Sequence, residues 1–155
     1  MATQPTIQTI LDPRYSDLVL DEDIKNYSHN SRDVVSVTAT TGGTFPMGSV
    51  IFCARAITAS AVWDFVDAQA DIAITNDYAI VIGDDLEPTE NVTFVTATNR
   101  NAIALTRNCR LKQAKLEASL LATFAAASAT DIANLIRVLA TQGILVGGSL
   151  TAIAP

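Results

Sequence analysis

The sequence is poor in the residues on which most catalytic sites depend. It has one histidine and two cysteines in 155 residues. Any Ser-His-Asp or Cys-His mechanism must therefore use His29, which lies in a polar stretch without a helix or strand period. Because a general base needs a rigid and oriented environment, we interpret His29 as an inert polar residue. The sequence thus predicts no catalytic residues and no enzyme activity.

Signals for export and membrane insertion are also missing. The chain does not begin with a basic segment followed by an apolar run, so we expect no secretory signal. The longest uncharged apolar stretch, residues 118–130, is too short and too rich in alanine to cross a bilayer. We expect a protein made in a cytosol with no membrane partner. Cys53 and Cys109 are then predicted to be reduced, buried and unpaired.

Positive charge is scarce outside the last third of the chain. The formal net charge is −6, and residues 34–99 carry one Lys or Arg against eight Asp and Glu. A protein that follows nucleic-acid phosphates needs a basic face, so we expect no nucleic-acid partner. The basic residues near the end lack interleaved aromatics, which favours a charged edge over an RNA or DNA site. They are Arg100, Arg107, Arg110, Lys112 and Lys115.

Two further patterns fail as ligand sites. Gly42-Gly43 and Gly147-Gly148 are not followed by the residues of a phosphate loop, so we expect no nucleotide and no other cofactor. Four acids surround the turn before and after Pro88, but they lack the spacing of an EF-hand, so we expect no metal. They are Asp84, Asp85, Glu87 and Glu90. Asp64, Asp67, Asp71 and Asp77 are too dispersed to be treated as paired carboxylates.

The chain divides into an N-terminal arm, residues 1–33, and a single body, residues 34–155. The arm has prolines and scattered acids but no sustained period. It also carries many large apolar residues, which favours an arm that becomes ordered on a partner over a frayed terminus. At 49%, the hydrophobic content of the whole chain suggests that other subunits cover some of its surface.

The body is predicted to be α+β and mainly β, a small barrel or sandwich with two helices in its C-terminal half. Val35, Val37 and Ala39 alternate with polar residues, as in a half-buried strand. Trp63, Phe65 and Val66 are expected to anchor the core. The further predicted strands are residues 49–57, 61–66, 78–82, 91–98, 102–106 and 144–146.

Two segments near the end are rich in helix formers. Residues 111–127 are predicted to form one helix, and residues 131–142 a second, with four aliphatic residues on one face. Thr130 or Asp131 is the expected N-cap of the second helix. Gly143 is the expected left-handed residue that ends it.

Four motifs, in this order, resemble those of the head decoration, or capsid cement, proteins of tailed bacteriophages related to the lambda cap protein. The resemblance covers about residues 30–146. Its motifs are Ser31-Arg32-Asp33 before the first strand, Phe45-Pro46-Met47-Gly48-Ser49-Val50, Asp77-Tyr78-Ala79-Ile80-Val81-Ile82, and the segment from Leu139 to Val146. Thr98-Asn99-Arg100-Asn101 departs from the Arg-Gly that the family has after its later strand.

The resemblance implies a β-tulip-like structural protein that binds expanded heads as homotrimers and stabilises them against internal DNA pressure. The implied partner is the major capsid protein, and the implied location is the outer surface of the virion after synthesis in the host cytoplasm. The arm is implied to add backbone hydrogen bonds to capsid strands. Its candidate contacts are Tyr15, Leu18, Leu20, Tyr27, Arg32 and Val35.

Two other functions remain open. The same arm and body suit a tail, baseplate or other low-copy virion component. A metal-dependent enzyme would have to use the turn between Asp84 and Glu90.

Overall fold

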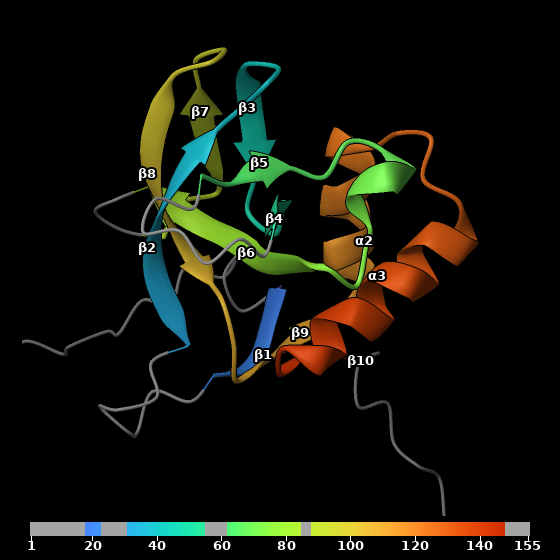
Figure 1. Ribbon diagram of the computed structural model, residues 1–155. Helices are drawn as coiled ribbons and strands as arrows, with labels where there is room; N and C mark the ends of the chain where they lie inside the picture. The colour runs from blue at the N-terminus through green and yellow to red at the C-terminus, as the bar shows by residue number, and fades with distance from the viewer. Residues whose placement is uncertain (1–17, 23–30, 55–61, 85–87, 148–155) are drawn as a thin grey trace, which may run out of the picture.

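The computed structural model describes residues 18–22, 31–54, 62–84 and 88–147. These residues form an α+β fold made mostly of strands, which confirms the predicted class. Helices α2 (Gln113–Thr123) and α3 (Ala129–Thr141) lie together on one side of the strands (Figure 1).

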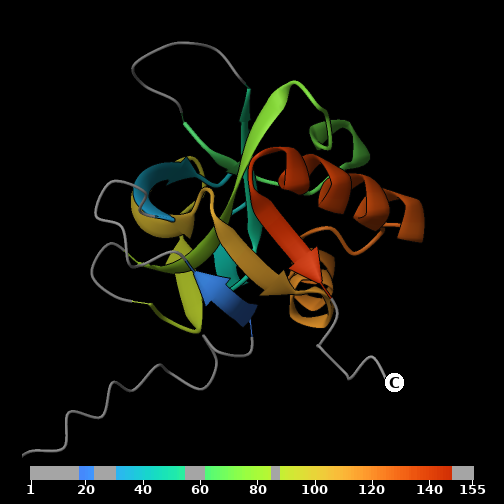
Figure 2. The same ribbon diagram turned by 90° about the horizontal axis from the view of Figure 1, so that it is seen from below.

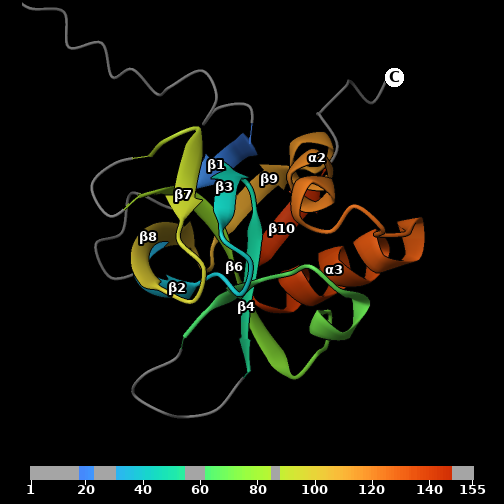
Figure 3. The same cartoon turned by 90° about the horizontal axis from the view of Figure 1, so that it is seen from above.

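The largest sheet has five strands in the order β2-β8-β6-β4-β5. Every neighbouring pair is antiparallel. The strands are β2 (Arg32–Thr38), β4 (Val50–Ala54), β5 (Asp64–Phe65), β6 (Asn76–Asp84) and β8 (Asn99–Leu105). The strand order is open, but the two edges meet at one parallel bridge between Val37 and Trp63. Trp63 N–H donates to Ser36 C=O at 3.0 Å, and Thr38 N–H donates to Trp63 C=O at 2.8 Å. The sheet therefore curls around its own interior, as the view from above shows (Figure 3).

Two smaller sheets complete the body. Strands β3 (Gly43–Pro46) and β7 (Asn91–Phe94) form an antiparallel pair. Strand β9 (Cys109–Lys112) lies between β1 (Val19–Glu22), which is antiparallel to it, and β10 (Ile144–Gly147), which is parallel to it. Figure 2 shows β10 beside α3 and β9. A short 3₁₀ turn, η1 (Gln69–Asp71), precedes β6.

Two hydrophobic cores follow from this arrangement. The inner core fills the curled sheet with alternating residues of β2, β6, β7 and β8, and includes Val35, Val37 and Phe65. The outer core lies between the strands and the helices, and includes Leu18, Met47 and Val66. Phe65 and Val66 thus enter different cores, and Trp63 is partly buried against the inner one. This confirms their predicted anchoring role. Cys53 and Cys109 are buried, and neither forms a disulfide with a described residue.

The first helix begins later than the sequence suggested. Residues 111–112, which were expected to be helical, belong to β9, and α2 ends at Thr123. Cys109 and Leu111 are buried while Arg110 is exposed, so this segment follows the period of a strand. Residues 111–112 form a strand despite their helix propensity, because β1 and β10 pair with the two edges of this segment.

The second helix agrees with the prediction except at its N-cap. The N-cap of α3 is Ser128, so the predicted caps Thr130 and Asp131 are wrong. Asp131 N–H donates to the Ser128 hydroxyl at 3.2 Å, and Ser128 N–H donates to the Asp131 carboxylate at 2.9 Å. Asp131 is therefore the third residue of a capping box. Gly143 follows the helix with a φ of 80° and confirms the predicted end.

The predicted N-terminal arm contains one strand of the body. β1 pairs with β9, and the Leu18 side chain is completely buried in the outer core. A cut before Ser31, which the sequence alone suggests would spare the body, therefore removes a strand and a core residue. Residues 1–17 and 23–30 lie outside the described ranges.

The turn between β3 and β4 requires a glycine at position 48, and this requirement can be tested. This residue has a φ of 98°, and an added Cβ would lie 2.7 Å from Ser119 Oγ. We expect Gly48→Ala to lower the free energy of unfolding by more than about 2 kcal/mol, since backbone strain and a clash add. Gly143→Ala, whose Cβ would meet nothing closer than 3.4 Å, should cost about 1 kcal/mol. Urea denaturation measures both; equal losses would contradict the steric account.

Candidate functional site

The residues predicted to contact a capsid fall into three groups. Tyr15 and Tyr27 lie outside the described residues. Leu18 is completely buried and Val35 is 8% exposed, so their side chains are occupied inside the body. Leu20 in β1 and Arg32 at the start of β2 are partly exposed. Among the described residues of the predicted capsid contact, Leu20 and Arg32 are therefore the two whose side chains a partner could reach.

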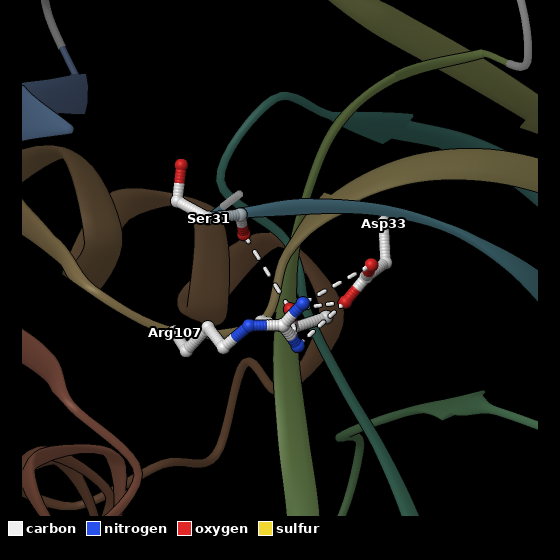
Figure 4. Close-up of polar contacts among 4 residues, drawn as sticks. Ser31, Asp33 and Arg107 are labelled. Carbon is white, nitrogen blue, oxygen red and sulfur yellow. Dashed lines mark hydrogen bonds and ion pairs between the residues drawn. The ribbon is translucent and has the colours of Figure 1, made fainter. Parts of the chain in front are cut away.

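A polar cluster fixes the start of β2 against the end of β8 (Figure 4). Thr106 N–H donates to Ser31 C=O at 2.8 Å, and the Thr106 hydroxyl donates to Asp33 Oδ2 at 2.6 Å. Arg107 donates to both carboxylate oxygens of Asp33, at 2.9 and 3.4 Å. The cluster therefore sets the direction in which the chain enters the body at Ser31. It also borders a hollow of about 350 Å³, whose other walls include Trp63, Asp77 and Gln142.

The five basic residues that are close in the sequence between positions 100 and 115 lie on several different elements. Arg100 on β8 donates to Thr93 C=O, lies 5.9 Å from the Phe94 ring centre and is 3.9 Å from Asp84. Arg107 follows β8 and pairs with Asp33. Arg110 and Lys112 lie on β9, and Lys115 lies on α2. Arg100 and Arg107 thus hold the fold together at two different places.

The acidic turn is described only in part. Asp84 ends β6 beside Arg100, Glu90 precedes β7, and Asp85 and Glu87 lie outside the described residues. His29 lies outside them as well. Within the described ranges, no three His, Cys, Asp or Glu side chains are grouped so that they would hold a metal ion.

A second hollow, of about 310 Å³, lies between β3, β5 and α2. Its walls are residues 41–45, Asp64, Phe65, Asp67, Ala122 and Thr123. The Phe45 and Phe65 rings are stacked, with centres 3.7 Å apart and planes 6° apart. No local sequence pattern indicates this hollow, because its walls come from three segments that are distant along the chain.

Asp67 and Asp71 are closer than the sequence suggested. The Asp71 carboxylate accepts from the backbone N–H groups of Asp67 and Ala68, at 3.2 and 3.0 Å. Partial burial, together with the charges of Asp71 and Asp64, raises the pKa of Asp67. The expectation that these acids are dispersed is therefore wrong for this pair. Their spacing of four residues, which a tight turn brings together, was the sequence feature that could have predicted this proximity.

Comparison with known proteins gives no match: no family model, no curated protein and no solved structure matches the chain. Among the helices of the described residues, none has both the length and the apolar character to cross a membrane.

The cluster at Asp33 predicts unequal effects of its two partners. Arg107 and Asp33 are 46% and 41% exposed, so Arg107→Ala should lower the free energy of unfolding by less than about 1 kcal/mol. Asp33→Ala also removes the acceptor of the partly buried Thr106 hydroxyl, and should cost about 1 kcal/mol more. Chemical denaturation of both variants checks this. A larger loss for Arg107→Ala would show that the ion pair dominates.

The raised pKa of Asp67 predicts the pH dependence of a variant. A carboxyl whose pKa is raised by folding binds its proton more tightly in the native state, so its ionisation destabilises the fold as pH rises above the ordinary value of 3.8. We expect Asp67→Asn to be more stable than wild type at neutral pH, by less than about 1 kcal/mol because the group is exposed. The gain should vanish below pH 3.8. Thermal unfolding at several pH values measures it; a gain independent of pH would contradict this origin.

Proposed function

We propose that this chain is a structural decoration protein that binds the expanded head of a tailed bacteriophage as a homotrimer and stabilises it. The observation that carries the proposal is the ordered set of motifs that resemble those of the cap proteins. In the described residues these motifs occupy positions on which the fold depends. Ser31 and Asp33 belong to the cluster that fixes β2. Residues 45–50 form the turn at Gly48, and residues 139–146 form the end of α3 and most of β10.

The body offers what a cement protein requires mechanically. Its two cores share strands, so the sheets and helices support one another. The proposed mechanism is physical: many weak contacts, summed over a closed shell, resist internal pressure. Binding the expanded lattice and no earlier form stabilises that lattice by linkage. The proposed partner is the major capsid protein, at places where its subunits meet.

The proposed contact lies where the chain enters the body. The arm of the hypothesis is the sequence before Ser31 apart from β1, which belongs to the body, and the Asp33 cluster holds the point at which the arm joins β2. Arg32 follows Ser31 directly as the first residue of β2, and Leu20 lies on β1. An arm that adds a strand to a capsid sheet acquires affinity from backbone hydrogen bonds, which do not depend on side-chain identity.

Copy number in the virion tests the proposal directly. Quantitative mass spectrometry of purified particles should give hundreds of copies, or a number near that of the major capsid protein. A handful of copies would instead indicate a tail, baseplate or vertex component. Absence from purified virions would contradict every structural role in the particle and return attention to the enzyme alternative.

Two truncations separate the arm from the body. A chain that starts at Leu18 keeps every described contact, so we expect it to melt within a few degrees of the full chain and to lose binding to expanded heads. A chain that starts at Ser31 lacks β1 and Leu18, so we expect it to be strongly destabilised, by about 2–5 kcal/mol for the buried leucine alone. Co-sedimentation with purified heads measures binding. A chain from Leu18 that still decorates heads at full occupancy would exclude residues 1–17, including Tyr15, as the contact and would leave Leu20, Tyr27 and Arg32 as its candidates.

A further inference from the structure

One end of the body, here called the turn end, is made of two turns that each connect strands of different sheets, and neither turn contains a charged residue. The turn between β2 and β3 lies beside the turn between β7 and β8, at the top of Figure 1. Ala97 N–H donates to Ala39 C=O, and Gly42 N–H donates to the Thr96 hydroxyl, each at 3.0 Å. Residues 34–54 and 91–99 include no Asp, Glu, Lys or Arg. The exposed polar side chains here are Thr40, Thr41, Thr44, Thr93, Thr96, Thr98 and Asn99.

The 310 Å³ hollow opens beside this uncharged end. One of its walls is the Phe45 ring, which is partly exposed. Phe65 is stacked on this ring and Phe94 meets it edge-on at 5.7 Å, so the ring is held in one orientation. A rigid aromatic wall is suited to a flat, apolar ligand surface. The volume lies at the lower end of the range for ligand sites, about 300–1,000 Å³, which indicates a small ligand unit.

The other walls supply oriented hydrogen-bonding groups. The Asp64 carboxylate accepts from Thr40 N–H at 3.1 Å, from Phe65 N–H at 2.8 Å and from the Thr40 hydroxyl, so its position is fixed. Asp67 adds a second carboxylate, and no Lys or Arg of the described residues lines the hollow. The Thr41 hydroxyl has no partner within the described part of the chain. The site therefore combines fixed acceptors, a free hydroxyl and an aromatic face.

We propose that this hollow binds a neutral carbohydrate. A sugar ring has a C–H face that packs on an aromatic side chain and neighbouring hydroxyls that donate to carboxylates. One sugar unit would lie against Phe45 with its hydroxyls toward Asp64 and Asp67. The rest of the glycan would extend over the threonine hydroxyls of the turn end. This site is separate from the proposed capsid contact, and neither depends on the other.

A cationic side chain is the competing ligand, because two carboxylates also attract positive charge. The surroundings favour the sugar. A basic peptide gains from a wide acidic surface, whereas the two turns beyond the hollow contain no acidic residue and the neighbouring β8 carries the cation Arg100. An extended glycan finds several threonine hydroxyls and the Asn99 amide there, with which it exchanges hydrogen bonds, and the exposed Val95 side chain adds an apolar contact.

The test uses the full chain on an array of neutral, acidic and basic oligosaccharides, with an arginine-rich peptide as the competing probe. The best neutral oligosaccharide is then titrated by calorimetry. We expect Asp67→Asn to weaken its binding about tenfold, since a charged acceptor is lost. Because that variant is expected to be at least as stable as wild type, misfolding does not explain the loss.

A matched pair of helix variants locates the site. Ala122 and Ala118 are both exposed on α2, but only Ala122 lines the hollow. Ala122→Arg should fill the hollow and reduce binding at least tenfold, and Ala118→Arg should leave it unchanged. Equal effects of the two variants would place binding elsewhere. Binding of the arginine-rich peptide alone, or no neutral oligosaccharide bound at millimolar concentration, would overturn the proposal.

Discussion

The turn at residues 46–49 is the constraint on which the rest of the structure depends. Met47 N–H donates to Glu90 C=O at 2.6 Å, Gly48 N–H donates to Val81 C=O at 2.8 Å, and Met47 C=O accepts from the Ser119 hydroxyl at 2.8 Å. One turn is thus bonded to β6, to the start of β7 and to α2. The backbone approaches α2 this closely because Gly48 has no Cβ, and glycine also adopts its positive φ without strain. The chain passes here from β3, which covers the inner core, to β4, which separates the two cores.

The hollow at Phe45 depends on this turn through the elements that it positions. The Ser119 hydroxyl of α2 donates to Met47 C=O directly after β3, and residues of both β3 and α2 line the hollow. At the other end of the five-stranded sheet, the Asp33 cluster joins the ends of β2 and β8. One end of the sheet therefore carries the two turns beside the hollow, and the other carries Ser31 and the Asp33 cluster.

Polar side chains in the described residues are used largely to hold the backbone. The Tyr78 hydroxyl donates to the carbonyl groups of Asp71 and Ala73, and Gln142 bonds to the backbone of Asn76 and Tyr78. Thr123 bonds to Val66 C=O across the outer core. Such bonds satisfy backbone groups that the short strands leave unpaired. Within the described residues, these bonds tie the turns to the strands and helices.

The sequence by itself determined the elements whose period is local. The alternation from Val35 to Ala39 specified β2, and the apolar face and terminal Gly143 specified α3, because side-chain direction repeats every two residues in a strand and every 3.6 in a helix. Tertiary structure decided the rest. β1 and β9 are four residues each and gain their hydrogen bonds from partners far away in the chain. The hollow likewise joins three distant segments. No local pattern encodes such a meeting, since it exists only once the sheets and helices have packed.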